Sequence, residues 1–347
     1  MKYGQKNHMQ LEQTTATTLK PARSRVPKSL RDRAVLFGLL ALLLIGLLGA
    51  AAATGWDETL AQMRKLSMWQ VCALLGFSLV NYALRGMRWH LFATRLGLRL
   101  SLIANMRHFL GGFAMTVTPG RVGELVRMRW IRRETGWAVD RTAPLVLVDR
   151  ASDLAAMAIL MGAALLVSGA HIAGGVPVVI LALIAAFVAT RPALLAHLAR
   201  IGYKTTGQLP RLFARVRRAA RSLEPFAQGG TLFQGSVLAF AGWLAEGIAF
   251  YLLLMWMGAD VTAATAIAIF LFSTLAGGLT GAPGGVGGAE AAMIALLSLE
   301  GVPMALSLPA TAIIRLTTLW FAIVIGLILF PIAERISKKV QNELENP

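Results

Sequence analysis

The sequence has a single cysteine, Cys72, so it can form no intrachain disulfide and no cysteine-based metal site. Its five histidines never occur in an H-x-x-H or H-E-x-x-H pattern, and the P-loop phrase G-x-x-x-x-G-K-S/T does not occur. These absences argue against a metal centre and against a transporter driven by its own nucleotide hydrolysis. We therefore expect no metal and no cofactor.

Charged side chains are also scarce, at 15% of 347 residues against 56% hydrophobic residues, and the mean hydropathy is +0.63. Soluble domains carry about 25% charged residues, so this composition lies outside their usual range. Residues 34–53 contain no charge over the roughly 20 residues that cross a hydrocarbon core of about 30 Å. The sequence predicts an all-α polytopic membrane protein, with a cleaved signal peptide as the alternative for this first run.

The net charge of +17 comes from 34 Lys and Arg residues, and their placement is more informative than their number. They gather before residue 34, within 85–141, within 191–221 and after residue 330, whereas the opposite loops hold only Arg64 and Lys65. Such a bias marks the cytoplasmic side of a membrane protein. We expect both termini in the cytoplasm, a cytoplasmic (inner) membrane location and no nucleic acid partner.

The apolar runs predict about six full spans, or about eight if two broken segments also cross completely. The approximate bounds of the full spans are 34–53, 68–84, 143–168, 177–190, 234–257 and 305–330. We expect a disordered leader at 1–33, one transmembrane domain at 34–334 and a cytoplasmic tail at 335–347.

The broken segments are 101–118 and 262–300. A full crossing by the first would place the arginine-rich stretch 121–141 outside, so we predict a re-entrant hairpin that breaks near Gly111-Gly112. The second contains G-G-L-T-G-A-P-G-G-V-G-G, whose backbone polar groups cannot face lipid. We predict a hairpin or two short crossings that face protein or a polar cavity.

A similar phrase belongs to both broken segments, P-G-R-V-G-E at 119–124 and P-G-G-V-G-G-A-E at 283–290. Arg150 follows the first proline by 31 residues and Arg315 follows the second by 32, each with another proline six residues before it. The order span, span, broken unit, span thus occurs twice with opposite parity. The halves 34–170 and 177–330 predict an inverted-topology repeat, with a chance match of two glycine-rich phrases as the alternative.

Ionisable residues at membrane depth cost about 2.5 to 3.5 kcal/mol to insert and are therefore candidates for function. Asp149, Arg150 and Asp153 are close enough along a helix to pair, either within a transport site or as a self-neutralising ion pair that only locks two helices together. Arg315 and Glu246 have no partner nearby in the sequence. They pair with each other or serve a ligand.

Glu124 and Glu290 follow the Pro-Gly turns at expected helix starts, where a carboxylate interacts favourably with the helix dipole. The same turns expose N–H groups that can bind phosphate, and arginine binds phosphate through its planar fork. We predict a central site for an anionic headgroup. Its expected binding residues are Arg121, Arg150, Arg315, Gly120, Gly123, Gly284, Gly285 and Gly287. Its expected coupling or charge-network residues are Glu124, Asp149, Asp153, Glu246 and Glu290.

The basic loop 191–225 contains arginines that alternate with apolar residues at helical spacing. They are Arg211, Arg215, Arg218 and Arg221. The pattern predicts an amphipathic helix on the anionic inner leaflet, or else a charged loop that only fixes the topology.

Four motifs in order resemble the flippase-like membrane region of lysylphosphatidylglycerol synthases, the multiple peptide resistance factors. They are N-Y-A-L-R-G-M-R-W-H from Asn81, T-P-G-R-V-G-E from Thr118, L-V-D-R-A-S-D-L around Val148 and G-A-P-G-G-V-G-G-A-E from Gly281. The resemblance covers roughly 34–334. It implies a stand-alone translocating region without the aminoacyl-transfer activity, because the synthases' further spans and soluble transfer domain have no counterpart in these residues. The positions that fall on the motifs are Arg121, Glu124, Asp149, Arg150, Asp153 and Glu290.

We therefore expect a non-enzymatic lipid translocase that moves an anionic or polyprenyl-linked lipid between leaflets. One alternative is a non-catalytic membrane partner of a lipid or cell-envelope enzyme. Another is a membrane-embedded lipid-modifying enzyme that uses the buried carboxylates as acid and base. Membrane lipids are the expected partners, and a protein partner or a second copy of the chain stays open.

Overall fold

The structure is a computed structural model that describes residues 61, 64–116, 122–168, 174–206, 223–226 and 229–345. All of them belong to one compact unit, Gly46–Pro347. Every regular element in the described residues is helical, as the sequence predicts. The predicted leader at 1–33 and the first predicted span at 34–53 lie outside the described residues.

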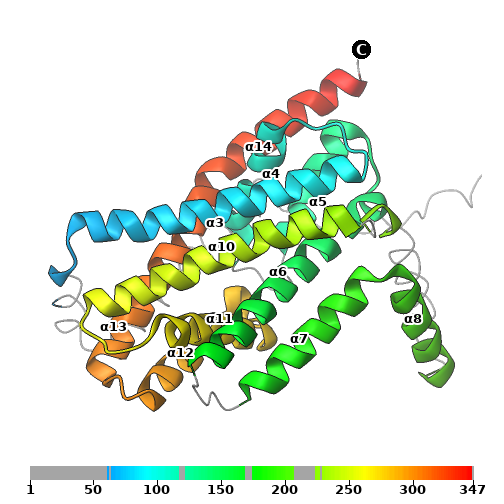
Figure 1. Ribbon diagram of the computed structural model, residues 1–347. Coiled ribbons are helices and arrows are strands. Elements are labelled where there is room, and N and C mark those ends of the chain that lie inside the picture. The colour runs from blue at the N-terminus through cyan, green and yellow to red at the C-terminus, as the bar shows by residue number, and fades with distance from the viewer. Residues whose placement is uncertain are drawn as a thin grey trace, which may run out of the picture. The chain divides into compact units, whose positions relative to one another are not determined.

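Figure 1 shows the helices of the described residues. The first group comprises α3 (Met68–Arg95), α4 (Leu102–Gly111), the 3₁₀ helix η1 (Gly112–Met115), α5 (Val122–Thr135) and α6 (Val139–Ser168). The next comprises α7 (Gly175–Thr190), α8 (Pro192–Thr206), the short turn η2 (Glu224–Phe226) and α10 (Gly229–Trp256). The last comprises α11 (Ala263–Leu279), η3 (Pro283–Gly285), α12 (Gly288–Leu299), α13 (Met304–Arg315), the π-helix η4 (Leu316–Trp320) and α14 (Phe321–Glu345).

Two helix starts are set by hydroxyl side chains. The Ser101 hydroxyl accepts a hydrogen bond from the backbone N–H of Ala104 at 3.2 Å and begins α4. The Thr262 hydroxyl accepts one from Thr265 at 3.1 Å and begins α11. Each side chain satisfies a donor that a helix start otherwise leaves unpaired. The two capped helices occupy corresponding places, because each is the first limb of a helical hairpin.

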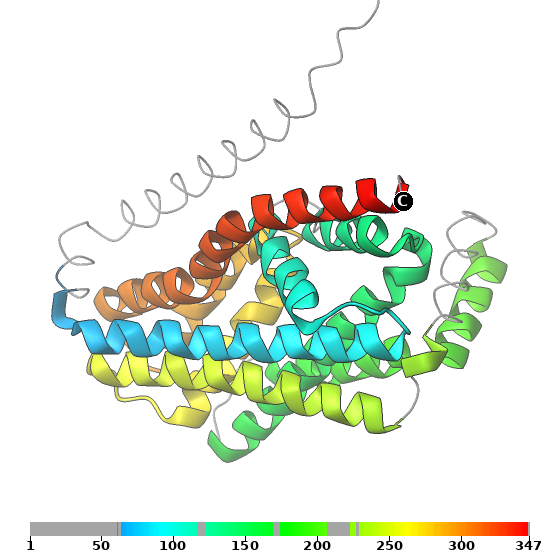
Figure 2. The ribbon, with the colours of Figure 1, turned by 90° about the horizontal axis from the view of Figure 1, so that it is seen from above.

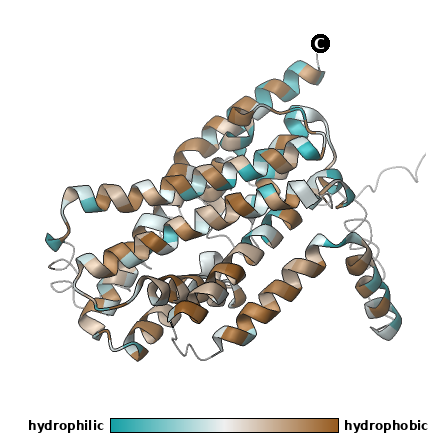
Figure 3. Cartoon of the chain, viewed as in Figure 1, coloured by the Kyte–Doolittle hydropathy of each residue, from teal (hydrophilic) through white to brown (hydrophobic). Residues whose placement is uncertain are grey.

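Three helices in the described part are long and apolar enough to cross a membrane. They are α6, α10 and the continuous helix Met304–Glu345 that α13, η4 and α14 form. The helices α7 and α8 pass the same test only as a pair, with a bend of 101° between them. Figure 3 shows α7 apolar along most of its length. These features fit the predicted multi-pass membrane protein. The helix α3, which contains the predicted span 68–84, continues to Arg95 and does not meet the test, so the number of spans stays a prediction.

The helices α3 and α10 form the most extensive helix pair, and they lie side by side in opposite directions (Figures 1 and 2). At one end the rings of Trp69 and Trp256 are 5.2 Å apart. Towards the other end Gly235 faces Phe92, so closely that a Cβ on this glycine would lie 2.5 Å from the ring. Small residues of this kind let membrane helices approach one another.

The helices α4 and η1 form an antiparallel hairpin with α5. Gly123 packs against the backbone of Gly112, so that a Cβ on Gly123 would lie 2.5 Å from the carbonyl oxygen of Gly112. At the open end, Arg107 donates a hydrogen bond to Glu134 at 2.8 Å. The charged helix α5 is therefore the return limb, whereas the sequence analysis left it in a cytoplasmic loop.

The predicted break at Gly111-Gly112 is wrong in its position. Both glycines have right-handed helical backbone angles, and the helix only tightens to 3₁₀ geometry there. Glycine weakens a helix without forbidding it, and here the missing side chains make room for neighbours. A Cβ on Gly111 would lie 3.2 Å from the Trp130 ring, and one on Gly112 would lie 2.3 Å from Nε of Arg127.

The second broken segment forms a hairpin of α11 and α12 around η3. Its turn falls within the glycine-rich phrase that the sequence analysis identified. Gly285 has a φ of +69°, and a Cβ at this position would lie 3.1 Å from the backbone of Gly277. The positive φ and the close contact together require glycine here. Gly277 in turn lies against Ala289, where an added Cβ would come within 2.6 Å of the alanine Cβ. Whether either hairpin is re-entrant in a bilayer stays a prediction.

Two apolar clusters enclose the polar residues between the hairpins. The first joins α6, α10, α11, α12 and α13, with Phe250 and Ile269 fully buried. The second joins α3, α4, α5, α6 and α14 around Trp89 and Phe109. Side chains from both clusters reach the cavity that forms the candidate site.

The hairpin contact at Gly277 predicts a stability difference between two glycine replacements. In Gly277→Ala the new Cβ overlaps Ala289, and we expect a loss of about 1–3 kcal/mol. In Gly76→Ala nothing lies within 4 Å of the new Cβ, so the better helix propensity of alanine should hold or raise stability. Thermal unfolding of the purified protein in detergent measures both, and equal midpoints would contradict the packing.

Candidate functional site

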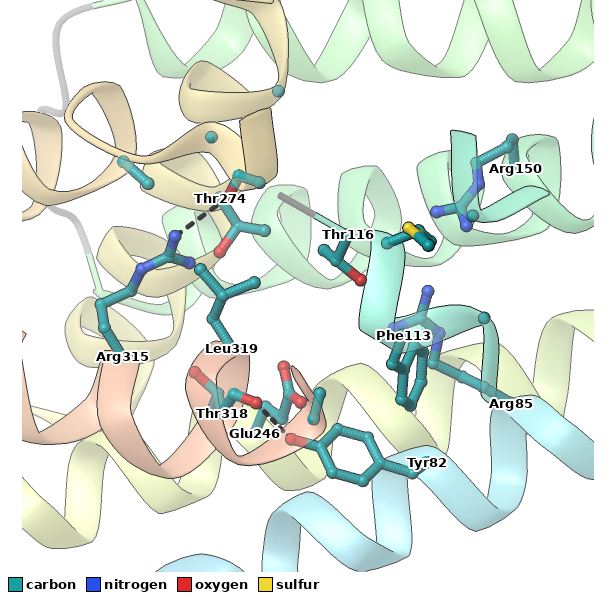
Figure 4. Close-up of a pocket in the computed structure, with 18 of the residues that line it drawn as sticks. Tyr82, Arg85, Phe113, Thr116, Arg150, Glu246, Thr274, Arg315, Thr318 and Leu319 are labelled. Atoms are coloured by element: carbon teal, nitrogen blue, oxygen red, sulfur yellow. Dashed lines mark hydrogen bonds between the residues drawn. The ribbon is translucent and has the colours of Figure 1, made fainter. Parts of the chain in front are cut away.

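A cavity of about 490 Å³ lies between the two hairpins and the helices α3, α6, α10 and α13. Its wall includes the glycines of both hairpins, among them Gly112, Gly123, Gly284 and Gly285. Figure 4 shows Arg315 and Arg150 entering from opposite sides of this space. Five of the predicted headgroup residues therefore line one cavity: Gly123, Arg150, Gly284, Gly285 and Arg315.

Positive charge dominates the wall of the cavity. It contains four arginines and two glutamates: Arg85, Arg127, Arg150, Arg315, Glu124 and Glu246. Glu124 and Arg127 both lie on α5, and each of the others comes from a different helix. Thr116, Thr274 and Thr318 add hydroxyl groups. Within the described residues, no group of three or more His, Cys, Asp and Glu side chains is arranged to hold a metal ion.

Two ion pairs occupy equivalent places in the two halves. Nε of Arg150 lies 2.7 Å from Oε1 of Glu124, which stands in the first turn of α5. Nε of Arg315 lies 2.6 Å from Oε1 of Glu290, which stands in the first turn of α12. In each half, the helix after the hairpin therefore binds the start of the hairpin's second limb.

The second of these pairs is anchored further. Glu290 accepts a hydrogen bond from the backbone N–H of Gly287 at 2.7 Å, so it caps α12 as expected for a carboxylate at a helix start. Arg315 also donates to the carbonyl of Gly284 at 3.0 Å. The turn of the second hairpin is thus held by the arginine that follows it.

The pairing of Arg315 with Glu246 that the sequence left open is wrong. No salt bridge joins them in the described residues, because Glu290 on the adjacent hairpin takes the guanidinium at 2.6 Å. Glu246 is 5% exposed on α10, and no hydrogen bond or ion pair to its carboxylate occurs in the part of the chain that the structure describes. It faces the same cavity.

The charged triplet on α6 pairs with α3 more than with itself. Asp149 lies 2.6 Å from Arg88, a fully buried side chain. Asp153 lies 2.8 Å from Arg88 and 3.0 Å from Arg85, but 3.4 Å from Arg150. The local pairing with Arg150 is therefore the weakest of these contacts, and the two aspartates join α6 to α3 through Arg88 and Arg85 rather than neutralising Arg150 within the triplet.

Arg127 is the cavity arginine that has no acidic partner among the described residues. It is 3% exposed, and its guanidinium lies 4.2 Å from the centre of the Phe109 ring. Its Nε and Nη1 atoms are buried without a hydrogen-bond acceptor in the described structure. The missing side chain of Gly112 provides the space beside it. A buried cation in this state is expensive unless a ligand or water pairs with it.

A π-helix follows Arg315 along the cavity wall. The hydroxyl of Tyr82 donates a hydrogen bond to the carbonyl of Thr318 within this π-helix, as Figure 4 shows. A π-helix leaves part of the regular hydrogen-bond ladder unmade and often occurs at functional sites. The hydrogen bond from Tyr82 joins α3 to η4 at this point.

The remaining predicted site residues fall into three groups: those that line the cavity, one that lies outside it, and those outside the described residues. Gly123, Gly284 and Gly285 line the cavity, but Gly123 also serves the close contact within the first hairpin. Gly287 is exposed and acts through its bond to Glu290. The expected residues that lie outside the described part are Gly120, Arg121, Arg211, Arg215, Arg218 and Arg221.

Three further charged residues were not predicted from the sequence as site residues: Arg85, Arg88 and Arg127. The first two lie beyond the predicted end of a span at residue 84, because α3 continues as a buried helix to Arg95. Their spacing of three within N-Y-A-L-R-G-M-R would have placed them on one helix face. Arg127 stood among many arginines in a stretch interpreted as a cytoplasmic loop.

A known family matches most of the chain. The family model described as the lysylphosphatidylglycerol synthase TM region matches residues 34–326. The chain belongs to this family. The match includes both hairpins and every cavity residue named above, and it confirms the resemblance carried by the four sequence motifs.

Two UPF0104 membrane proteins from Methanothermobacter thermautotrophicus are similar to parts of the chain. One is 29% identical over 140 residues, which cover 39% of this chain and 41% of the relative. The other is 32% identical over 108 residues, which cover 31% of each. The matched stretches thus span less than half the length of these relatives.

The buried pair of Arg88 and Asp149 predicts a rescue. Arg88→Met leaves Asp149 buried without its cation, and we expect a loss of about 3–5 kcal/mol. The double variant Arg88→Met/Asp149→Leu should recover most of that loss, since Asp153 keeps Arg85 and the indole N–H of Trp243 at 2.9 Å. Unfolding midpoints in detergent measure the difference. A double variant no more stable than the single one would contradict this pairing.

Proposed function

We propose that the protein is a lipid translocase whose central cavity receives an anionic headgroup while the apolar tails stay in the bilayer. The observation that carries this proposal is Arg127, a buried cavity arginine without an acidic partner in the described residues. Family membership supports a role that involves membrane lipids. We propose a transport role rather than a chemical one.

Phosphate suits the chemistry of the cavity. The guanidinium of Arg127 offers unused N–H donors, and Arg150, whose side chain is 33% exposed, lies on the same wall with its Nε on Glu124. Arginine forks bind phosphate oxygens with geometric specificity, and a desolvated site strengthens that interaction. An anionic phospholipid or a polyprenyl-linked phosphate presents this group at the end of an apolar tail.

The exterior of the described helices suits such tails. The exposed side chains of α7 include Leu181, Ile184 and Phe187, and the cavity wall itself includes Phe113 and Phe270. A headgroup can therefore lie among arginines while its chains contact apolar side chains. This separation of polar and apolar surface is what a lipid moving through a protein requires.

An inverted-topology repeat would supply the alternating access. Support comes from the antiparallel packing of α3 and α10, from one helical hairpin in each half, and from the matched pairs of Arg150 with Glu124 and Arg315 with Glu290. In transporters of this kind, halves rock about a site near the midplane. We propose that the two hairpins close the cavity alternately towards the two leaflets of the cytoplasmic membrane, with both termini in the cytoplasm.

Leaflet exchange in liposomes tests the proposal. Purified protein is reconstituted with fluorescent phosphatidylglycerol, phosphatidylcholine or a polyprenyl phosphate, and the label in the outer leaflet is quenched chemically. We expect exchange of an anionic lipid by wild type and a loss of about 10- to 100-fold in Arg127→Gln, because a charge-assisted hydrogen bond contributes about 1.5–3 kcal/mol. Arg335→Gln, which removes an exposed arginine on α14, should keep the wild-type rate.

A second variant leaves the charge in place. Gly112→Ala puts a Cβ within 2.3 Å of Nε of Arg127, so the guanidinium must move although its charge remains. We expect impaired exchange here as well. The absence of exchange for every anionic lipid, in protein with a normal unfolding midpoint, would contradict the proposed function.

A further inference from the structure

Two charged side chains in the cavity lack a partner among the described residues, and they have opposite signs. Arg85 is paired with Asp153, Arg150 with Glu124, and Arg315 with Glu290. Arg127 and Glu246 are left over. Both line the same cavity. An incoming monoanion would satisfy Arg127 and would bring a second negative charge to the space that Glu246 faces.

The charged surroundings of Glu246 come from several elements. Tyr82 and Arg85 face it from α3, Asp153 from α6 and Arg315 from α13. The helix α11 has no ionisable side chain.

No donor around Glu246 in the described residues bonds to its carboxylate, although the Nε of Arg85 is buried without an acceptor. Arg85 donates to Asp153, and Arg315 donates to Glu290 and to the carbonyl of Gly284. The hydroxyl of Tyr82 donates to the carbonyl of Thr318. An ionised carboxylate at Glu246 therefore accepts no hydrogen bond in the described structure, whereas a neutral carboxyl in this place is far less costly.

A proton suits Glu246 better than a ligand ammonium does. An ammonium beside this carboxylate would lie near the guanidinium groups of Arg85 and Arg315, which repel it. A proton adds no new cation, because it neutralises the carboxylate. A phosphate anion in the same cavity adds a negative charge to the space that Glu246 faces, and this charge favours the neutral carboxyl.

We propose that Glu246 takes up one proton when a monoanionic phosphate headgroup binds at Arg127, so that lipid anion and proton cross the membrane together. This inference rests on the proposed function. The proton comes from water on the side to which the cavity is open, binds a carboxylate oxygen, and returns to water on the other side when the headgroup leaves. The pair carries no net charge, so a pH gradient drives the exchange and a membrane voltage does not.

Binding of a short-chain phosphatidylglycerol to the purified full-length protein tests this linkage. Affinity is measured from about pH 5.5 to about pH 8.5 in wild type and in Glu246→Gln. A linked proton weakens wild-type binding by about tenfold per pH unit once the carboxyl ionises, by the reciprocity of coupled binding. Glu246→Gln mimics the neutral carboxyl and should bind at the wild-type low-pH level throughout. Glu300→Gln, which changes an exposed carboxylate between α12 and α13, should keep the wild-type profile.

Wild type alone supplies a second readout. Titration with phosphatidylglycerol in a weakly buffered solution containing a pH indicator should show uptake of about one proton per bound lipid at a pH where Glu246 is ionised. This measurement holds even if Glu246→Gln fails to fold.

Failure of the coupling and failure of the function give different results. Wild-type binding that depends on Arg127 but not on pH, or an unchanged pH profile in Glu246→Gln, would overturn the coupling and leave lipid translocation standing. Preference for phosphatidylethanolamine that is lost in Glu246→Gln would overturn it in favour of an ammonium site. No binding of any lipid by folded protein at any pH would overturn both.

Discussion

Most charges in the described interior of this membrane protein are paired, and the pairs determine how its helices are joined. Asp149 and Asp153 bind Arg88 and Arg85, and so hold α6 against α3. Arg150 and Arg315 each bind a glutamate at the start of a hairpin limb. A buried ion pair adds little stability compared with an apolar pair, but losing one partner is costly. The ion pairs therefore determine which helices pack together, and the apolar clusters on either side stabilise that packing.

Two buried charged groups lack such a partner in the described residues, and this sets them apart from the ion pairs. Arg127 rests on aromatic rings and Glu246 faces the cavity, and neither has an opposite charge bound to it in the described residues. Apolar side chains would pack in these places at lower cost. The presence of the two charged groups beside a cavity of about 490 Å³ is the reason for assigning this space to an anionic ligand and its accompanying proton.

Much of the fold could be predicted from the sequence, because apolar runs and glycine-rich phrases report local geometry. The second hairpin forms at the phrase that begins at Gly277, where positive φ angles and close contacts require glycine. The first hairpin was harder. Gly111 and Gly112 pack inside a helix, and the arginine-rich return limb resembles a cytoplasmic loop in composition.

The partners of the charged residues could not be predicted in the same way. The spacing of Asp149, Arg150 and Asp153 favours local pairing, yet Arg88 is closer to both aspartates, from a helix some sixty residues earlier in the chain. The choice of Glu290 over Glu246 for Arg315 likewise depends on how the second hairpin folds back. Such contacts arise from tertiary packing, which one-dimensional spacing does not encode.

The central claim is that the cavity between the hairpins is a lipid headgroup site, and thiol accessibility tests it most directly. Thr274 on α11 lines the cavity, so Thr274→Cys in a Cys72→Ser background places one reactive group there. In proteoliposomes we predict labelling by a membrane-impermeant thiol reagent that anionic lipid slows and zwitterionic lipid does not, while a cysteine at the exposed Glu300 is indifferent to lipid. Equal labelling of Thr274→Cys in both lipids, or no labelling at all, would contradict the account.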